Sequence, residues 1–187
     1  MPSRLLLIEG PAGGGKSGEA RRAVREGAVD VIADYTALWA AMLGIRRLGD
    51  GTYPIREPGE AVSSGFIFYM QRAVARSALR SGLRVAVTTD RPGTAPDWAG
   101  IARDHRAGFE VRTVDPGRAV VERRLARGGK LSPECSLRIQ AWYRDRQERR
   151  REAKVQLVAE GRIPADAPLT DPLIKSRVNS NQRRRLV

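Results

Sequence analysis

The sequence predicts a three-layer α/β fold in which a parallel sheet of four or five strands lies between helices. Two observations support this prediction. Short aliphatic or β-branched runs alternate with segments of helical character, and each run ends at glycine or a polar residue, as buried parallel strands do. The 187 residues, 41% of them hydrophobic, suffice for one domain with an apolar core.

The elements follow from the chain in order. The predicted strands cover residues 4–8, 28–33, 83–88 and 109–114. The predicted helices cover residues 17–26, 34–43, 60–81 and 96–107, with a further helical stretch from about residue 117. That stretch breaks at Gly128 and restarts at Ser132-Pro133-Glu134, which has a capping serine followed by proline at the first helical position. The segment 44–59 is rich in glycine and proline, which favours an excursion outside the core layers.

One motif predicts a phosphate-binding site. Residues 10–17 read GPAGGGKS and match G-x-x-x-x-G-K-[ST] at every fixed position, between a predicted strand and a predicted helix. Glycines let backbone N–H groups turn toward phosphate oxygens, and the positive end of the following helix strengthens that field. Lys16 is expected to bridge the β- and γ-phosphates of ATP, and Ser17 to ligate Mg²⁺. The nucleotide-binding residues predicted here are Gly10, Gly13, Gly14, Gly15, Lys16 and Ser17.

Three aspartates follow predicted strands, at the sheet edge where α/β proteins bind ligands. Asp34 is predicted to be the general base that accepts the proton of an attacking hydroxyl, although the same residue is placed to cap a helix. Asp90 has two interpretations: a carboxylate that holds a Mg²⁺-bound water or a lid arginine, or the first residue of a turn. Asp115 is expected to cap the next helix.

A basic segment resembles a lid over the nucleotide. Arg123 and Arg127 are four residues apart, which places them on one face of a helix that leads into a glycine break. A guanidinium from such a lid would stabilise charge on the transferring phosphoryl group, so we predict catalytic roles for both. The alternative is a solvated basic helix face. The predicted lid covers about residues 118–135.

Charge concentrates in the last third of the chain. Residues 118–187 carry 18 basic and 8 acidic side chains, which accounts for +10 of the net charge of +13. This excess predicts a single-stranded nucleic acid as a partner, with contributions to solubility as the alternative. Prolines and the closing arginine run predict that residues 161–187 form an extended basic tail after a domain of residues 1–160.

Several classes are excluded by composition. No apolar run approaches the roughly 20 residues of a membrane span, and the N-terminus does not match a signal peptide, so we expect a cytoplasmic protein without a membrane partner. One cysteine (Cys135) and one histidine (His105) exclude an intramolecular disulfide and a Cys- or His-rich metal centre. Trp39, Trp98 and Trp142 are expected in the core.

From residue 4 to about residue 150, the chain resembles the 5′-kinase domain of bacteriophage polynucleotide kinases, within the adenylate-kinase-like and zeta-toxin-like P-loop phosphotransferases. The matching segments are GPAGGGKS, VDVIADYTALW, VAVTTD and VVERRLARGGKLSPECSLRIQAWYRDRQE. The resemblance implies Asp34 as general base, Asp90 as a supporting carboxylate and metal-site residue, and Arg127 with Arg123 as lid arginines. One departure concerns the acceptor. The family has an arginine shortly after the base that grips the substrate phosphate, whereas residues 35–38 contain none and the next candidates are Arg46 and Arg47.

These features together predict a P-loop NTPase fold with a helical lid and an ATP- and Mg²⁺-dependent kinase. The expected acceptor is the hydroxyl of a nucleic-acid 5′ end, with a nucleoside or another small molecule as the alternative. A nucleotide-gated nucleic-acid-binding or phage assembly ATPase without kinase activity is the rival from another class. The combination of Asp34 with the lid arginines favours the kinase, because a binding module has no need of a base.

Overall fold

The computed structural model describes residues 2–44, 64–128 and 131–184, with side chains as far as residue 178. Four strands in these ranges form one sheet in the order β2-β3-β1-β4, and every neighbouring pair is parallel. Their bounds are β1 Arg4–Glu9, β2 Val31–Ala33, β3 Arg84–Thr89 and β4 Gly108–Thr113. The predicted α/β fold with a parallel sheet of four or five strands is therefore confirmed, with four strands among the described residues.

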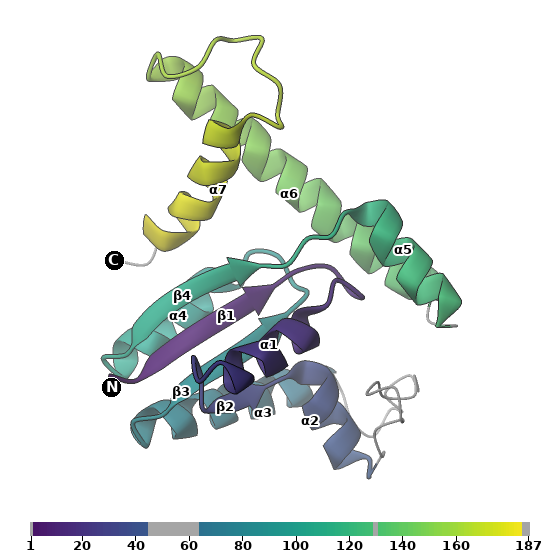
Figure 1. Cartoon of the computed structure of the whole chain (residues 1–187), viewed down its shortest axis with the longest axis vertical. Coiled ribbons are helices and arrows are strands. Elements are labelled where there is room, and N and C mark those ends of the chain that lie inside the picture. Colours follow the sequence, from purple (N-terminus) through teal and green to yellow (C-terminus); the bar gives the residue numbers. More distant parts are fainter. Residues whose placement is uncertain (1, 45–63, 129–130, 185–187) are drawn as a thin grey trace.

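Helices cover both faces of the sheet. Those of the N-terminal part are α1 Lys16–Arg25, α2 Tyr35–Met42, α3 Ser64–Arg80 and α4 Ala95–Asp104. In Figure 1, α1 lies in front of the sheet and α4 behind it. Alternate residues of β1 point to the two faces: Leu5 and Leu7 pack with α3 and α4, whereas Leu6 and Ile8 pack with α1. The core thus consists of two apolar layers divided by the sheet.

The second strand is shorter than predicted. Ala28 and Val29 were expected in it, but their backbone N–H groups donate to the Ala23 carbonyl oxygen at 2.8 and 3.3 Å and complete the end of α1. Val29 is still buried in the core beside α1. Val29 therefore lies outside β2, because its backbone N–H already bonds to the end of the preceding helix.

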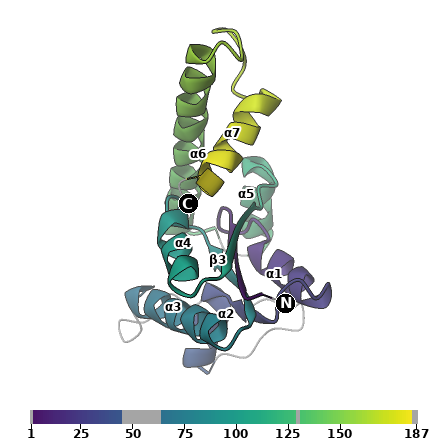
Figure 2. The same cartoon turned by 90° about the vertical axis from the view of Figure 1, so that its left-hand side faces the viewer.

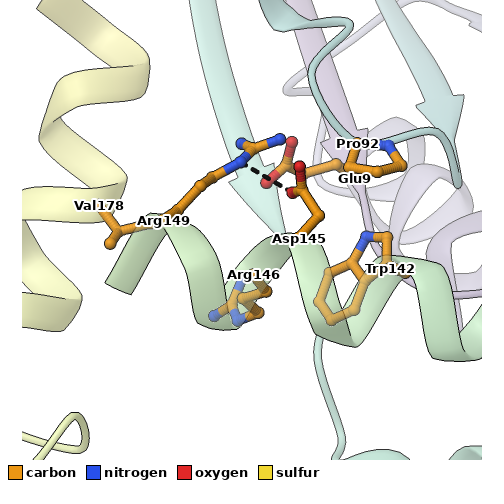
Figure 3. Close-up of a pocket in the computed structure, with 7 residues that line it drawn as sticks. All are labelled: Glu9, Pro92, Trp142, Asp145, Arg146, Arg149 and Val178. Carbon is orange, nitrogen blue, oxygen red and sulfur yellow. Dashed lines mark ion pairs between the residues drawn. The ribbon is translucent and has the colours of Figure 1, made fainter. Parts of the chain in front are cut away.

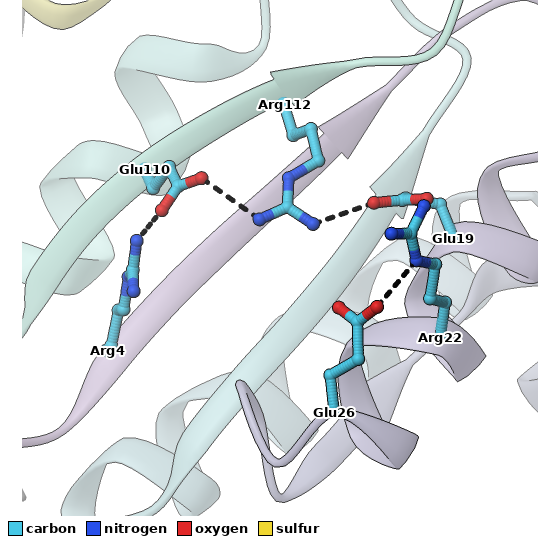
Figure 4. A network of polar contacts seen from close by, with 6 residues as sticks. All are labelled: Arg4, Glu19, Arg22, Glu26, Glu110 and Arg112. Atoms are coloured by element: carbon cyan, nitrogen blue, oxygen red, sulfur yellow. Dashed lines mark hydrogen bonds and ion pairs between the residues drawn. The ribbon is translucent and has the colours of Figure 1, made fainter.

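A polar network holds the edge strand β4 to the other elements. Figure 4 shows Arg112 of β4 between two carboxylates, with 2.7 Å to Glu19 of α1 and 3.3 Å to Glu110 of the same strand. Arg4 of β1 pairs with Glu110 as well. Because Glu19 lies in the first turn of α1, the network ties β4 to the helix that follows the phosphate-binding loop.

The C-terminal part is helical. Its elements are α5 Arg118–Arg127, α6 Pro133–Ala159 and α7 Pro172–Arg184. Figures 1 and 2 show α6 extending beyond the sheet and α7 folding back beside it. No helix in the described ranges is long and apolar enough to cross a bilayer.

The prediction that residues 161–187 are extended is wrong for residues 172–184, which form α7. Ile174 and Val178 lie one helical turn apart and pack with Ala153 and Leu157 of α6. Asp171 starts the helix, since its carboxylate accepts a hydrogen bond from the Leu173 N–H at 2.7 Å. The apolar stripe is only two turns long and follows three prolines, so the composition of this segment does not predict a helix.

Candidate active site

The phosphate-binding loop joins β1 to α1, and its shape requires glycine. A Cβ added at Gly10 would lie 2.3 Å from the Val114 carbonyl oxygen, and one at Gly14 would lie 2.9 Å from the Pro11 carbonyl oxygen. Both distances are shorter than a normal van der Waals contact of a Cβ atom, and both clashing atoms belong to the backbone. The close approach of loop and backbone therefore excludes larger residues at these positions.

Two further glycines turn the chain through the left-handed region. Gly13 has φ of +73° and Gly15 has φ of +105°, and Gly15 is the residue that precedes α1. The loop consequently delivers the chain directly into the N-terminus of a ten-residue helix whose first N–H groups face the loop. A helix N-terminus of this kind favours anions, and all four predicted glycines lie in the loop before it.

Lys16 bends back over the loop. Its Nζ donates hydrogen bonds to the carbonyl oxygens of Gly10 at 3.0 Å and Pro11 at 2.8 Å. Loss of hydration on burial lowers the pKa of Lys16 below its usual value, while the negative charges of Asp90 and Asp34 oppose that shift. The ammonium group thus lies within the field of both predicted carboxylates, on the loop where a phosphate chain would bind.

Asp34 combines the two roles that its position suggested. One carboxylate oxygen, Oδ1, accepts from the Ala37 N–H at 2.9 Å and caps α2. The other, Oδ2, accepts from the Ser17 hydroxyl at 2.7 Å and the Thr88 hydroxyl at 2.8 Å. The side chain is buried. Three of the roughly four lone-pair sites of the carboxylate are therefore occupied, and Asp34 lies directly beside the predicted Mg²⁺ ligand.

Asp90 follows β3 at the same edge, and among the charges that raise the pKa of Lys16 it has the largest effect. The turn after it is held by other groups: the Thr89 hydroxyl accepts from the Arg91 N–H at 3.1 Å, and the Thr94 hydroxyl donates to the Arg91 carbonyl oxygen at 3.2 Å. The alternative interpretation of Asp90 as a turn-starting side chain therefore has no supporting hydrogen bond among the described residues.

Asp115 does not cap the next helix, contrary to prediction. The residue before α5 is Gly117, and no side chain caps this helix. Asp115 instead accepts hydrogen bonds from the Gly117 N–H at 3.1 Å and the Tyr143 hydroxyl at 2.9 Å, and pairs with Arg146 at 3.2 Å. Burial and the neighbouring carboxylate raise the pKa of Tyr143. The aspartate is thus a structural anchor between β4 and α6.

The helix α5 lies against the phosphate-binding loop. Leu125 packs with Ala12 of the loop, and a Cβ added at Gly13 would lie 2.8 Å from Leu125 Cγ. Arg124, one residue away from a predicted lid arginine, reaches the loop and donates to the Gly14 carbonyl oxygen at 3.5 Å. Arg123 and Arg127 are exposed on the same helix.

The structure therefore brings Gly10, Gly13, Gly14, Gly15, Lys16, Ser17, Asp34 and Asp90 together. Arg123 and Arg127 are carried on the adjacent helix, and no contact in the described part of the chain joins either one to these residues. Arg46 and Arg47 lie outside the described residues.

The sequence reasoning missed Arg138 of α6. Its positive charge acts to lower the pKa of Lys16 and opposes the rise that burial causes in the pKa of Tyr35. Cys135 and Ile139, on the same stretch of α6, are buried against α5 and fix the rotation of the helix. The available signal was its spacing from those two apolar residues.

Gln71 was also missed. This fully buried side chain of α3 donates from Nε2 to the carbonyl oxygens of Ala33 and Thr88, at 2.7 Å each. It therefore joins the carboxyl ends of β2 and β3, directly before Asp34 and two residues before Asp90. A buried glutamine in an apolar helix face was the signal that could have identified it.

A small pocket lies where α6 crosses the end of β1. Figure 3 shows Asp145, Arg146 and Arg149 of α6 in its lining, together with Glu9, Pro92, Trp142 and Val178. Arg149 pairs with Asp145 at 2.8 Å, and the Arg146 guanidinium lies 5.2 Å from the Trp142 ring centroid. Both contacts lie within α6, whereas the pair of Arg146 with Asp115 joins α6 to the segment after β4.

Comparisons with known proteins support the fold. No protein-family model matches the chain. No curated protein sequence matches it either. A structure described as a candidate kinase from Chloroflexus aurantiacus J-10-fl has 17% identity and a TM-score of 0.54, covering 74% of this chain and 79% of that one. A chain of the Pnkp1/Rnl/Hen1 RNA repair complex has 19% identity and a TM-score of 0.54, covering 79% of this chain and 47% of that one.

A gluconokinase from Sinorhizobium meliloti 1021 has 15% identity and a TM-score of 0.46, and the match covers 98% of this chain and 93% of that one. The two structures with the higher TM-scores show that the chain has the α/β fold of P-loop kinases. At these identities the likeness concerns the fold, so function has to be argued from the site.

Proposed function

We propose that this protein is an ATP- and Mg²⁺-dependent phosphotransferase that moves the γ-phosphoryl group to a hydroxyl, with a nucleic-acid 5′ end or a nucleoside as acceptor. The observation that carries the proposal is the 2.7 Å hydrogen bond between Ser17 and Asp34 at the mouth of the glycine loop. This contact supports the proposal because a carboxylate next to the proposed phosphate site can accept the proton of an attacking hydroxyl.

The loop and Lys16 fit a phosphate chain. Glycines allow the tight path of the loop, because a Cβ at Gly10, Gly13 or Gly14 would clash with neighbouring atoms, and the Lys16 ammonium donates to carbonyl oxygens of the same loop. On ATP binding, Nζ would exchange its contacts with loop carbonyl oxygens for phosphate oxygens, which are stronger partners for a charged donor. Arg124 reaches the loop from α5 and would add positive charge where the transition state spreads negative charge.

The donor set also fits Mg²⁺. This ion is typically held by one or two carboxylates together with substrate phosphates and waters, and Ser17 and Asp90 supply a hydroxyl and a carboxylate at one edge. When bound, the ion neutralises charge on the β- and γ-phosphates. No group of three or more His, Cys, Asp or Glu side chains in the described ranges could hold a metal ion.

Asp34 would act as the general base. Its remaining lone-pair site can accept the proton of the acceptor hydroxyl while that oxygen forms a bond to the γ-phosphorus and the bond from this phosphorus to the β-phosphate oxygen breaks, releasing ADP. The hydrogen bonds from Ser17, Thr88 and Ala37 hold the carboxylate in one orientation during this transfer. Such positioning is a large part of phosphoryl-transfer catalysis.

Nucleic acid is the preferred acceptor because exposed arginines remain on α6. Within the described part of the chain Arg144 and Arg151 form no ion pair, and they lie seven residues apart on the same helix face. Contacts of this kind predict binding that weakens steeply with salt, by about −0.7 in the log–log slope per phosphate neutralised on a single strand.

The test is transfer of radiolabel from γ-labelled ATP to a 5′-hydroxyl oligonucleotide, to a nucleoside, or to water. We expect label on a hydroxyl, abolished by Lys16→Ala and unchanged by Lys175→Ala, a control at an exposed lysine of α7. Label found in inorganic phosphate alone would overturn the kinase proposal and favour the nucleotide-gated ATPase.

A further inference from the structure

The strands β2 and β3 separate at their carboxyl ends, in a buried part of the molecule. Their ladder ends at the pair of Ala33 with Val87. Beyond this pair β2 turns into α2 through the capping residue Asp34, whereas β3 continues to Thr89. Ala33 and Thr88 lie on the two sides of the separation, which we call the strand fork, and both are at most 2% exposed. Because bulk water does not reach their carbonyl groups, donors for them have to come from the protein.

Gln71 of α3 supplies both donors. Its Nε2 donates to the carbonyl oxygens of Ala33 and Thr88 at 2.7 Å each, so the two hydrogens of one amide group serve both oxygens of the strand fork. The side chain is fully buried, and its Oε1 forms no hydrogen bond with the described residues. Burying an unpaired amide oxygen lowers stability, which an apolar residue of the same size would not do. The contribution of Gln71 therefore lies in its two donors rather than in packing.

Both carbonyl groups belong to residues that determine where Asp34 lies. Ala33 directly precedes Asp34, so its carbonyl is part of the peptide group that joins the two residues. Thr88 orients the carboxylate from the other strand: its hydroxyl donates to Asp34 Oδ2 at 2.8 Å and accepts from the Tyr35 N–H at 3.4 Å. Gln71 thus holds the backbone of Asp34 and also the backbone of a residue that orients its side chain.

The ladder by itself holds this end of β2 weakly. Among the described residues β2 is an edge strand, and it pairs with β3 over three residue pairs, whereas β1 and β3 pair over six. Ser17 lies at the start of α1, which follows β1 on the other side of β3. The 2.7 Å contact of its hydroxyl with Asp34 Oδ2 therefore depends on how β2 lies against β3 at the strand fork. A displacement of about 1 Å can slow a reaction by about 100-fold.

We propose that Gln71 is a positioning residue for phosphoryl transfer, which holds the strand fork together and so fixes the Asp34 carboxylate beside the phosphate-binding loop. This inference rests on the proposed function and names a residue that serves the proposed base without touching substrate. Both of its donors are occupied by backbone oxygens. Loss of these donors should therefore change the rate of transfer and leave the affinity for ATP unchanged.

The test variant is Gln71→Met, which keeps the length and nearly the volume of the side chain and removes both donors. Calorimetry with a non-hydrolysable ATP analogue measures nucleotide affinity. Single-turnover transfer of label from γ-labelled ATP to a 5′-hydroxyl oligonucleotide measures the rate. We expect an affinity within about twofold of wild type and a rate about 10- to 100-fold lower. Misplacement of a base predicts this difference between binding and rate.

Leu79→Ala is the control for loss of stability. Leu79 is also buried on α3 and lies about 12 Å along the helix from Gln71, away from the strand fork. Its truncation leaves a cavity in the core, so it should lower the free energy of unfolding in denaturant without changing the transfer rate. Comparing the two variants separates the effect of the strand fork from the effect of a weaker core.

A second control removes the group through which Gln71 is proposed to act. In the Asp34→Asn background the base is absent, so adding Gln71→Met should lower the residual transfer rate no further. A purely structural effect would instead lower the rate by the same factor in both backgrounds.

Amide hydrogen exchange, followed by NMR on the free protein, reports the position of Asp34 without turnover. The Ala37 N–H donates to Asp34 Oδ1, and the Tyr35 N–H donates to the Thr88 hydroxyl. Gln71→Met should speed up exchange at both N–H groups by about tenfold, which corresponds to the loss of about one hydrogen bond. The stability control should change exchange at these two positions by less.

Gln71→Asn is the variant to use if Gln71→Met does not fold. It keeps an amide group on a shorter side chain, which cannot hold both carbonyl oxygens of the strand fork at 2.7 Å. We expect the same two changes, slower transfer and faster exchange, by smaller factors.

The inference is overturned if both readouts of Gln71→Met match those of Leu79→Ala, or if the rate falls by the same factor in the Asp34→Asn background. The proposed function fails differently. Faster exchange in Gln71→Met, together with no label on any hydroxyl in wild type, would leave the positioning of Asp34 standing and remove the kinase. Label transfer in wild type that neither Gln71 variant slows would leave the kinase standing and remove the inference.

Discussion

Replacing Asp34 by asparagine separates its structural role from its proposed chemical role. Asparagine caps a helix as well as aspartate does, so the 2.9 Å hydrogen bond from the Ala37 N–H should persist. The amide cannot accept a proton from a hydroxyl, and general bases contribute about 10²- to 10⁴-fold. We therefore expect ATP binding to be retained and phosphoryl transfer to fall by at least about 100-fold.

The stability change can be estimated from the same contacts. In Asp34→Asn the Ser17 and Thr88 hydroxyls lose a charged acceptor but can turn to accept from the new NH₂ group, which leaves a cost of about 1–2 kcal/mol. Asp34→Ala removes all three hydrogen bonds, including a cap that contributes about 1 kcal/mol, for a total of about 3–5 kcal/mol.

Denaturant unfolding gives the stabilities, and single-turnover label transfer gives the rates. Asp97→Asn is the matched control, because this exposed carboxylate of α4 lies outside the site and should leave transfer unchanged. If Asp34→Asn keeps transfer within about tenfold of wild type while Asp34→Ala unfolds easily, Asp34 is a helix cap and the base lies elsewhere.

Three further predictions concern the lid, the loop and pH. Arg127→Ala should lower the rate of transfer more than the affinity for ATP in calorimetry, and equal losses would indicate a ground-state phosphate contact. Gly13→Ala should destabilise the fold by about 2–4 kcal/mol, because φ at this residue is +73° and the new Cβ would lie 2.8 Å from Leu125 Cγ. Combining it with Leu125→Ala should recover part of the clash energy, so the double variant should lose less stability than the sum of the two single variants. Strictly additive losses in denaturant unfolding would contradict the contact. The Arg84 guanidinium holds the pKa of Asp30 at about 2, so the stability that this ion pair contributes is present above about pH 4 and is lost as pH falls through about 2. The difference in unfolding free energy between wild type and Asp30→Asn should therefore shrink over that pH range. A difference that stays constant would refute this prediction.

The phosphate-binding loop could be predicted because its chemistry is local. Eight consecutive residues contain the glycines, the lysine and the hydroxyl, and their spacing alone determines how the backbone can turn. The strands β1 and β3 could be predicted for a similar reason, since strands buried on both faces consist of continuous apolar residues. The sheet edge that carries Asp34 and Asp90 follows from where those runs end.

The failures share a physical cause, which is competition between local and distant partners. Asp115 has the position of a helix cap, but Tyr143 and Arg146 of a helix 28 or more residues away take its oxygens. Residues 172–184 have the composition of an extended tail, but Ile174 packs against Ala153 and Leu157 of α6 and so the segment folds as a helix. Neither partner can be identified from the residues next to these positions.

The sequence by itself determined that the chain forms a parallel α/β sheet with a glycine-rich turn between the first strand and helix, because apolar runs and short motifs act over a few residues. Only the tertiary structure decided what surrounds that loop. The Thr88 hydroxyl donates to Asp34, which lies 54 positions earlier in the chain, and the Arg91 guanidinium lies over the Phe68 ring of α3. Such contacts depend on strand order and helix rotation, which are set by the packing of the whole core.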